Sequence, residues 1–525
     1  MRLKTKHVWF LAFTAVFAAL AGFVFWGTWS TDFAPVMPDC PISHAPHWFS
    51  DWCNGWLSSG KFVPGDVRTF IASPYFWQEL NYVIALYFSA LGAVYFLRGR
   101  GLSRLASYGA GLLLAFSGYW CTLFSAGHLG WFHWMTYGVF AFGLADRAIR
   151  KNKPKSWILL GATLAWGSFY QSDLWLLFSV FTFAYFVHAS VRERKIPDFR
   201  GMALAAAAFF LIGAPSFYSA VFKDLAGRDK QIAEGQTVAR SVVDEDEKRW
   251  IFMTNWSLPP AETAEFFLPR LNGDTSCPLT LSIGAQKGTG VKPYTGALGR
   301  PKDAPSGNYR QHSLYVGFIT CLFALAGVAL GRRKALFFAV AAVVFWLFSL
   351  GRYFECVYRC VYALPFGDYL RAPVKWHHLT EFSIVVLAAY GIDSLQKIFS
   401  SSARFSRFAP FVLGAIVLLG AFDLARVDRL FCSPVDMTEA RRQNCSFQMT
   451  FLKRSDFNNP QIAAMVKAKR IVPLANPNPE MYLVGVLQPW GRPAEQSARF
   501  ALPAALGLIS IFASLAAIAY CLRKT

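Results

Sequence analysis

The chain is dominated by long apolar runs separated by short polar segments. Twelve of these runs approach the roughly 20 residues that a helix needs to cross a hydrocarbon core of about 30 Å. The fifth and sixth are short, and only "YQSD" separates them. The pattern predicts an all-α polytopic membrane protein with about 12 transmembrane helices. The runs begin near Val8, Tyr75, Leu105, Trp131, Trp157, Leu174, Met202, Ser313, Ala335, Leu379, Ala409 and Phe500.

Basic residues collect in alternate polar segments. If the N-terminus is cytoplasmic, the segments "MRLKTK", "RGRGLSR", "DRAIRKNKPK", "VRERKIPDFR", "GRRK", "KIFSSSARFSR" and "LRKT" all lie inside. They contain nearly half of the 52 lysine and arginine residues, which is the positive-inside pattern with both termini in the cytoplasm. The first apolar run lacks a clear small-residue cleavage site, so we expect it to be retained as the first helix.

Composition agrees with a membrane protein. The chain is 54% hydrophobic and only 16% charged, against about a quarter charged in an ordinary soluble domain. A net charge of +21 on a soluble domain would suggest a nucleic-acid partner. Here the charge follows the topology, so we expect no nucleic acid among the partners.

The topology leaves several large segments on the outer face. The segment 223–312 begins with mixed charge and becomes rich in Pro and Gly, so we expect loops and short helices there. We therefore divide the chain into a transmembrane core (1–426, with outer loops 27–73, 223–312 and 351–378), an outer segment (427–497), and a last helix with a cytoplasmic tail (498–525).

Cysteines favour the same outer segments. Seven of the ten lie there, as expected if that side is oxidising. Cys40 with Cys53, and Cys432 with Cys445, are plausible local disulfides, although sequence alone does not give the connectivity.

Two aspartates in the first outer segment are candidates for catalysis. Asp32 and Asp39 follow the first helix directly, where a carboxylate could take a proton from an acceptor hydroxyl. The alternative is that each is a solvated loop residue. The nearby "HAPH" offers only two histidines, too few to bind zinc, so we predict no metal site from it. A divalent cation is the one cofactor that the prediction allows.

Polar residues also interrupt the apolar runs. His128 stands in the turn "SAGHLG", and Gln171 and Asp173 lie in "YQSD". Lipid cannot satisfy such groups, so we expect them to line one wet cavity that binds substrate. Helix capping is the alternative for His128.

The richest polar stretch is "GDYLRAPVKWHHLTEF". Arg371 and Lys375 are four residues apart, and His378 and Glu381 are three apart, so on a helix each pair would share a face. Pro373 suits the first turn of that helix. Basic groups there fit a lipid-linked phosphate, unless they only snorkel to the interface. We expect Glu381, a turn deeper, to be neutralised by Arg371, Lys375 or a histidine.

These motifs resemble the bacterial YfhO-like membrane protein family, which is similar to glycosyltransferases of the GT-C class. The resemblance rests on "SAGHLGWFHWMTYGVFAFGLADRAIRK", on "WSLPPAETAEFFLPRLNGD" before "YVGFITCLFALAGV", and on "FSLGRYFECVYRCVYALPFGDYLRAPVKWHHLTEFSIVVLAAYGIDSL". It implies the bacterial cytoplasmic membrane, a polyprenyl-phosphate-linked sugar donor, and a first-loop carboxylate as base, which is Asp32 or Asp39.

The expected function is therefore hexosyl transfer on the outer face to a cell-envelope glycan or lipid acceptor. His128, Gln171 and Asp173 would line the sugar cavity, while Arg371, Lys375, His378 and Glu381 would surround the donor phosphate. A transporter or flippase for a lipid-linked or anionic substrate is the alternative, and a noncatalytic scaffold is a third. Inverted repeats or helices broken at the midplane would favour transport.

Overall fold

The protein is an α-helical membrane protein with a small strand-containing part. The computed structural model describes residues 5–26, 33–35, 78–123, 129–169, 172–195, 197–219, 245–272, 313–364, 367, 370–401, 408–429, 434–436, 445–468, 470–478, 481–489 and 501–522.

A helix lies at each of the twelve predicted positions. These helices are α1 (Thr5–Val24), α4 (Gln78–Gly99), α5 (Arg104–Ala115), α7 (Leu129–Lys151), α8 (Pro154–Gly167), α9 (Ser172–Glu193), α10 (Phe199–Ser219), α14 (Phe318–Gly331), α15 (Leu336–Ser349), α17 (His377–Ser401), α18 (Ala409–Arg429) and α21 (Ala501–Leu522).

Six helices of the described chain are long and apolar enough to cross a bilayer, within α1, α4, α9, α10, α17 and α18. Others are shorter: α5 has 12 residues, and a rise of about 1.5 Å per residue gives it only about 18 Å. The helix α15 passes the same test only together with η7 (Gly351–Phe354) and α16 (Glu355–Tyr362), from which it is bent by 108°. The number of crossings therefore stays a prediction.

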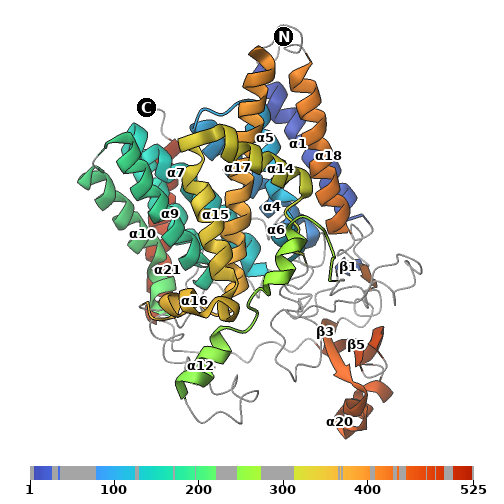
Figure 1. The fold of residues 1–525 in the computed structure, drawn as a ribbon. Helices are drawn as coiled ribbons and strands as arrows, with labels where there is room; N and C mark the ends of the chain where they lie inside the picture. The colour runs from blue at the N-terminus through green and yellow to red at the C-terminus, as the bar shows by residue number, and fades with distance from the viewer. Residues whose placement is uncertain are drawn as a thin grey trace.

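The long helices run side by side (Figure 1). The start of α1 and the end of α21 lie toward the upper end in this view. The short helices α12 (Glu245–Met253) and α16 lie at the lower end, together with the strands. The described termini of the bundle thus share one end, as the distribution of basic segments predicted.

The helix α17 is the centre of the core, where nearly every residue from His377 to Asp393 is buried. It crosses α14 at two glycines. A Cβ atom on Gly327 would collide with the carbonyl oxygen of Leu387, and one on Gly391 would collide with that of Phe323. The absence of side chains at this crossing lets the two backbones approach closely, as small residues do between membrane helices.

Strands occur where the sequence indicated only loops and short helices. In the predicted outer segment 427–497, β3 (Cys445–Lys453), β5 (Met481–Pro489) and β4 (Ile471–Asn478) form an antiparallel sheet in that order. A short helix, α20 (Pro460–Lys467), lies between β3 and β4 in the chain. The strands β1 (Phe33–Pro35) and β2 (Pro434–Asp436) pair antiparallel, which ties the first outer loop to the segment after α18.

Candidate functional site

The stretch before α17, residues 370–376, is the best described part of the predicted site, and we call it the lead segment. Ala372 has a left-handed backbone with φ of 64°, a conformation that non-glycine residues rarely adopt. Its N–H donates to the carbonyl of Met253 at 3.1 Å, and the N–H of Val374 donates to Trp256 at 3.2 Å. The lead segment is therefore held against the loop that follows α12.

An arginine and an indole meet across this pairing. The guanidinium carbon of Arg371 lies 4.8 Å from the ring centroid of Trp256, a cation–π distance. The guanidinium of Arg352 holds the loop that follows α12. It donates to the carbonyl of Thr254 at 3.1 Å and to Oδ1 of Asn255 at 2.9 Å. Arg352 thus holds the loop that presents Trp256 to Arg371.

The helix α16 is attached to the same segment. The hydroxyl of Tyr358 donates to the carbonyl of Leu370 at 3.0 Å, beside Arg371. On α16, the guanidinium carbon of Arg359 lies 4.0 Å from the ring of Trp250 and its Nη2 lies 2.8 Å from Glu355. Each of the two elements that this hydrogen bond joins therefore carries an arginine that lies over a tryptophan: Arg359 on α16 and Arg371 on the lead segment.

The predicted shared face of Arg371 and Lys375 is wrong. Pro373 does begin a helix, as predicted, but this is the 3-10 helix η9 (Pro373–Trp376), and the left-handed Ala372 keeps Arg371 outside it. Lys375 is only 6% exposed, so it does not snorkel toward solvent either. The two cations are neighbours in the lead segment without forming one helical stripe.

Glu381 does not have the predicted cationic partner. Its Oε1 accepts hydrogen bonds from the hydroxyl of Ser117 and from the N–H of Tyr119 at 3.2 Å. Ser117 is the N-cap of the short helix α6 (Gly118–Thr122), so the carboxylate caps its first turn. Within the described residues Glu381 forms no ion pair. The contacts are those of a structural cap.

His378 lies on the same face as Glu381, as its spacing predicted. Its ring is fully buried, stacked on Tyr119 at 4.3 Å between centroids and set edge-on to Trp120 at 5.9 Å. A side chain in this position does not reach solvent. A direct contact with a donor phosphate would require α6 to move, and the described contacts favour a packing role.

The loop that leads into α14 completes the support of α6. The carbonyl of Tyr315 accepts the N–H of Gly118 at 2.9 Å, and its hydroxyl is bonded to Asp423 on α18. The phenol donates this hydrogen bond, and a carboxylate oxygen of Asp423 accepts it. The start of α6 is thus tied to α17, α14 and α18 together.

Several predicted site residues lie outside the described residues: Asp32, Asp39, His128 and Gln171. Asp173 is in the first turn of α9, but its side chain is not described. The predicted disulfides also lie outside, apart from the backbone of Cys445. The prediction that His128, Gln171 and Asp173 share a cavity is therefore untested. The strand β1 begins directly after Asp32.

Two cavities lined by described residues can be compared with the size of a sugar. One, of about 10 Å³, is lined in part by Thr163, Trp175, Ser179 and Thr182 between α8 and α9, and has room for a single water. It is too small for a sugar. The other, of about 260 Å³, lies near the ends of α7 and α9, where Asn152, Trp157, Lys195 and Asp198 contribute to its wall.

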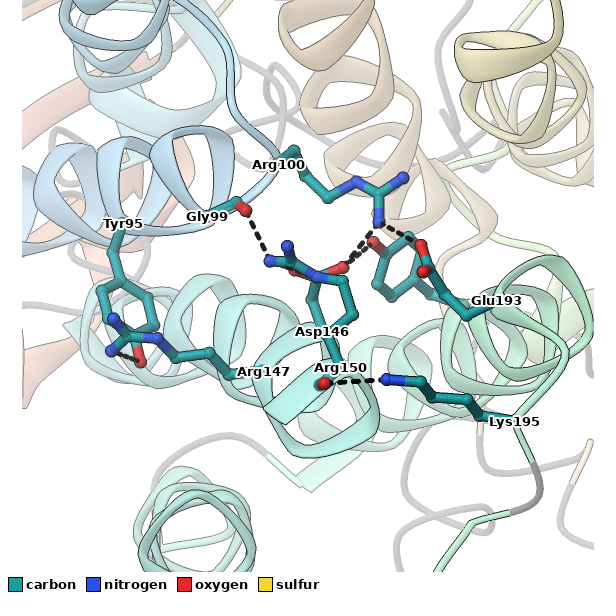
Figure 2. A network of polar contacts seen from close by, with 9 residues as sticks. Tyr95, Gly99, Arg100, Asp146, Arg147, Arg150, Glu193 and Lys195 are labelled. Carbon is teal, nitrogen blue, oxygen red and sulfur yellow. Dashed lines mark hydrogen bonds and ion pairs between the residues drawn. The ribbon is translucent and has the colours of Figure 1, made fainter. Parts of the chain in front are cut away.

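Figure 2 shows a polar network around Asp146. It lies away from the lead segment, because Ser103, three residues after Arg100, donates its N–H to Asp393 in the later part of α17. Asp146 on α7, 1% exposed, accepts from Arg100 and from the hydroxyl of Tyr185, both at 2.9 Å, and is paired with Arg150. Arg100 also lies 3.5 Å from Glu193. The network locks α4, α7 and α9 together and brings three predicted inside segments to one place.

No described group of three or more His, Cys, Asp or Glu residues is arranged to hold a metal ion. Comparisons of the chain with protein-family models, with curated proteins and with solved structures each returned no match. The resemblance to the YfhO-like family therefore stays a prediction.

Sequence analysis missed the residues that support the lead segment. Trp256 and Arg352 lie in two different quoted motifs that are more than 90 residues apart in the chain, so no local signal joins them. A Ser117 N-cap before an aromatic turn was a readable signal, because serine favours helix starts. Its partner Glu381, 264 residues later, was not.

Proposed function

We propose that the protein is a membrane glycosyltransferase of the GT-C class. It transfers one sugar from a polyprenyl-phosphate-linked donor to a cell-envelope glycan or lipid acceptor on the outer face of a bacterial cytoplasmic membrane. The observation that carries the proposal is the Arg371–Trp256 pair, held on the lead segment at the strand-bearing end of the bundle. The motif resemblance described above supports the same class.

Arg371 suits the donor phosphate. Guanidinium groups bind phosphate oxygens through two parallel N–H bonds, and a ring stacked on the guanidinium face fixes the plane in which those bonds point. When the sugar leaves, negative charge grows on the phosphate and needs a preorganised cation. Lys375 adds a second positive charge in a buried setting, where its field is screened less than in water.

The remaining roles follow the sequence prediction. Asp32 or Asp39 is the general base that activates the acceptor hydroxyl, and His128, Gln171 and Asp173 bind the sugar. For His378 and Glu381 the described contacts support a positioning role: they hold α6 beside the lead segment. No nucleotide is needed, since the donor is already activated on its lipid.

The first test replaces the arginine. Arg371→Ala is expected to lower sugar transfer by about a hundredfold, the usual effect of removing one group that stabilises developing charge. Arg371→Lys keeps a charge without the bidentate geometry and should recover only part of the rate. Transfer is measured by mass spectrometry of envelope glycans and lipids from cells with and without each variant at matched protein levels.

Arg359→Ala is the matched control, because Arg359 also lies over a tryptophan at the same end of the bundle. It should leave transfer within about threefold of the wild type, as expected for an exposed ion pair. Equal losses in the two variants would show that Arg371 has no special role.

The second test concerns the base. Asp32→Asn and Asp39→Asn are made singly and together, and the same glycans and lipids are analysed. One of the single variants should lose transfer by a factor of about a hundred or more, the scale of general base catalysis, at unchanged protein level. Normal modification of the glycans and lipids in the double variant would show that neither aspartate is the base.

A transporter is the second candidate because one helix pair is broken. The α15–α16 break of 108° resembles the broken helices of transporters. However, the break at Gly351 packs against Pro373 and Ser257 at the lead-segment end, whereas transporter breaks lie near the midplane. A transporter would move labelled polyprenyl-phosphate sugar across proteoliposomes without forming a new glycosidic bond.

A further inference from the structure

We propose that α16 lies flat in the headgroup region of the bilayer, with Tyr353, Cys356, Cys360 and Leu364 facing lipid. The partner of this surface is thus the bilayer itself. The inference concerns how the protein sits in its membrane, and it holds whether or not the chain is a transferase.

The four residues form an apolar stripe on the outside of the molecule. Tyr353 is 44% exposed, Leu364 is 58% exposed, and both cysteines are exposed. Cys356 and Cys360 are four residues apart on α16, so they share one side of this helix. Tyr353 lies in η7 just before α16, and Leu364 lies just after its last residue. In water this would be an unfavourable surface for so short a helix.

The other sides of α16 have different environments. Tyr358 and Val361 are buried against the protein, 2% and 4% exposed. Glu355 and Arg359, four residues apart, form an exposed ion pair at 2.8 Å. At about 100° per residue, these three groups occupy three separate sectors of the helix. The sector of Tyr358 and Val361 contacts protein, and the sector of Glu355 and Arg359 contacts water. The apolar sector has a third environment.

The bend identifies that environment as lipid. The helix α15 directly precedes the turn at Gly351, and its exposed residues Leu336, Val340 and Val343 form an apolar stripe of the kind that faces acyl chains. Since the chain then turns by 108°, α16 runs across the end of the bundle, as Figure 1 shows. A helix that leaves a lipid-facing helix at this angle continues along the membrane surface.

The thiols fit an apolar neighbour. Cys356 and Cys360 are free, and the Cys360 thiol donates to the carbonyl of Cys356 at 3.5 Å. Cys360 therefore needs no water molecule for its hydrogen bond. Lipid would also shield both thiols from aqueous oxidants, which react with accessible thiolates.

The position of α16 determines the depth of Arg371. The Tyr358 hydrogen bond to Leu370 joins α16 to the residue before that arginine. If α16 lies among headgroups, Arg371 lies near the level of lipid phosphates. This is the depth at which a lipid-linked phosphate would meet it.

The test measures thiol labelling in the full chain, held in lipid nanodiscs of phosphatidylethanolamine and phosphatidylglycerol, in which both membrane faces are open to solvent. A charged maleimide and a small apolar maleimide are compared, with peptide mapping by mass spectrometry to read each cysteine separately. Glu355→Cys provides a thiol on the water-facing sector of the same helix. Rates in denaturing detergent normalise the intrinsic reactivity of each thiol.

The charged reagent should label Cys356 and Cys360 at least about tenfold more slowly than the thiol in Glu355→Cys, because charge is excluded from lipid. Lipid also suppresses the reactive thiolate, but this effect is common to both reagents. The ratio of charged to apolar labelling rates should therefore be about tenfold lower at Cys356 and Cys360 than at the thiol in Glu355→Cys, because only the apolar reagent partitions into the membrane. Fast labelling of Cys356 and Cys360 by the charged reagent would place the stripe in water and overturn the inference. An equal ratio of the two rates at all three thiols would show that lipid does not cover the stripe, which also overturns the inference.

Discussion

Glu381 is a carboxylate inside an apolar helix, and its partners are a hydroxyl and a backbone amide rather than a cation. Buried polar groups are generally hydrogen-bonded, and a carboxylate beside a helix start satisfies amides that have no partner within the helix. At the scale of this residue, the cap accounts for Oε1, whereas the buried Oε2 has no hydrogen-bond partner among the described residues.

The cap can be separated from a substrate-binding role by substitution. Glu381→Gln keeps an oxygen that can accept from Ser117 and Tyr119, so it should change the free energy of unfolding little. Glu381→Ala leaves both donors unsatisfied and should destabilise the protein by about 1–3 kcal/mol. Thermal unfolding of the purified protein in detergent measures both changes.

Sugar transfer is assayed on the same two variants. Near-normal transfer by Glu381→Gln supports the structural cap. If Glu381→Gln is stable but inactive, the negative charge itself is needed and the cap does not explain the residue.

The lead segment shows what sequence could and could not predict at this scale. The helix start at Pro373 was readable, since proline suits a first turn. The shared face of Arg371 and Lys375 was not, because it assumed an unbroken α-helix. The left-handed Ala372 that interrupts it is fixed by hydrogen bonds to residues 253–256, more than 100 positions earlier.

At the scale of elements, α17 holds the start of α5 and the start of α6 through two acidic side chains. Glu381 caps α6, and twelve residues later Asp393 accepts the N–H of Ser103, the N-cap of α5, at 2.8 Å. The helix α5 therefore runs antiparallel to α17, and α17 carries an acceptor for each of two helix starts. These contacts fix both the register and the direction of α17 within the bundle.

The crossing of α14 and α17 gives an element-scale prediction. Gly327→Ala and Gly391→Ala should each destabilise the protein by about 1–3 kcal/mol or more, because the added methyl group meets backbone that cannot move away. Gly22→Ala on α1 is the control, since nothing lies within 4 Å of its Cβ position. It should be neutral or stabilising by up to about 1 kcal/mol.

Thermal unfolding in detergent again provides the measurement. Equal behaviour of Gly327→Ala and Gly22→Ala would mean that the α14–α17 crossing tolerates separation, contrary to the close approach described here.

Elements were predicted unequally well. Apolar runs predicted a helix at all twelve positions, because a long apolar run is a strong signal. The sheet was missed although the β3 sequence "SFQMTFLK" alternates apolar and polar residues, a strand pattern. Its partners β5 and β4 are brought together by the fold, and the segment 427–497 had been predicted only as an outer-face loop segment.

At the scale of the whole molecule, charge and shape agree. The Asp146 network joins segments that the positive-inside pattern had assigned to one side, and the lead segment lies at the other end. Lys155 also bonds to the carbonyl of Cys521, which brings the end of α21 to the same side. The side itself, cytoplasmic in our proposal, calls for a direct measurement.

Reporter fusions test this orientation. Green fluorescent protein fused after Thr525 should fluoresce, and alkaline phosphatase at that point should be inactive, because the C-terminus is expected in the cytoplasm. Alkaline phosphatase inserted after Asn458, between β3 and α20, should be active. The reverse pattern at both positions would invert the topology and remove the lead segment from the outer face.

The two caps on α17 also have a consequence for synthesis. Ser117 is separated from Glu381 by 264 residues, and Ser103 from Asp393 by 290. At a synthesis rate of about 5–20 residues per second, Glu381 and Asp393 are made on the order of 15 to 60 seconds after the starts of α5 and α6. During that interval the early helices are held by other contacts or by the insertion machinery, and arrival of α17 completes them.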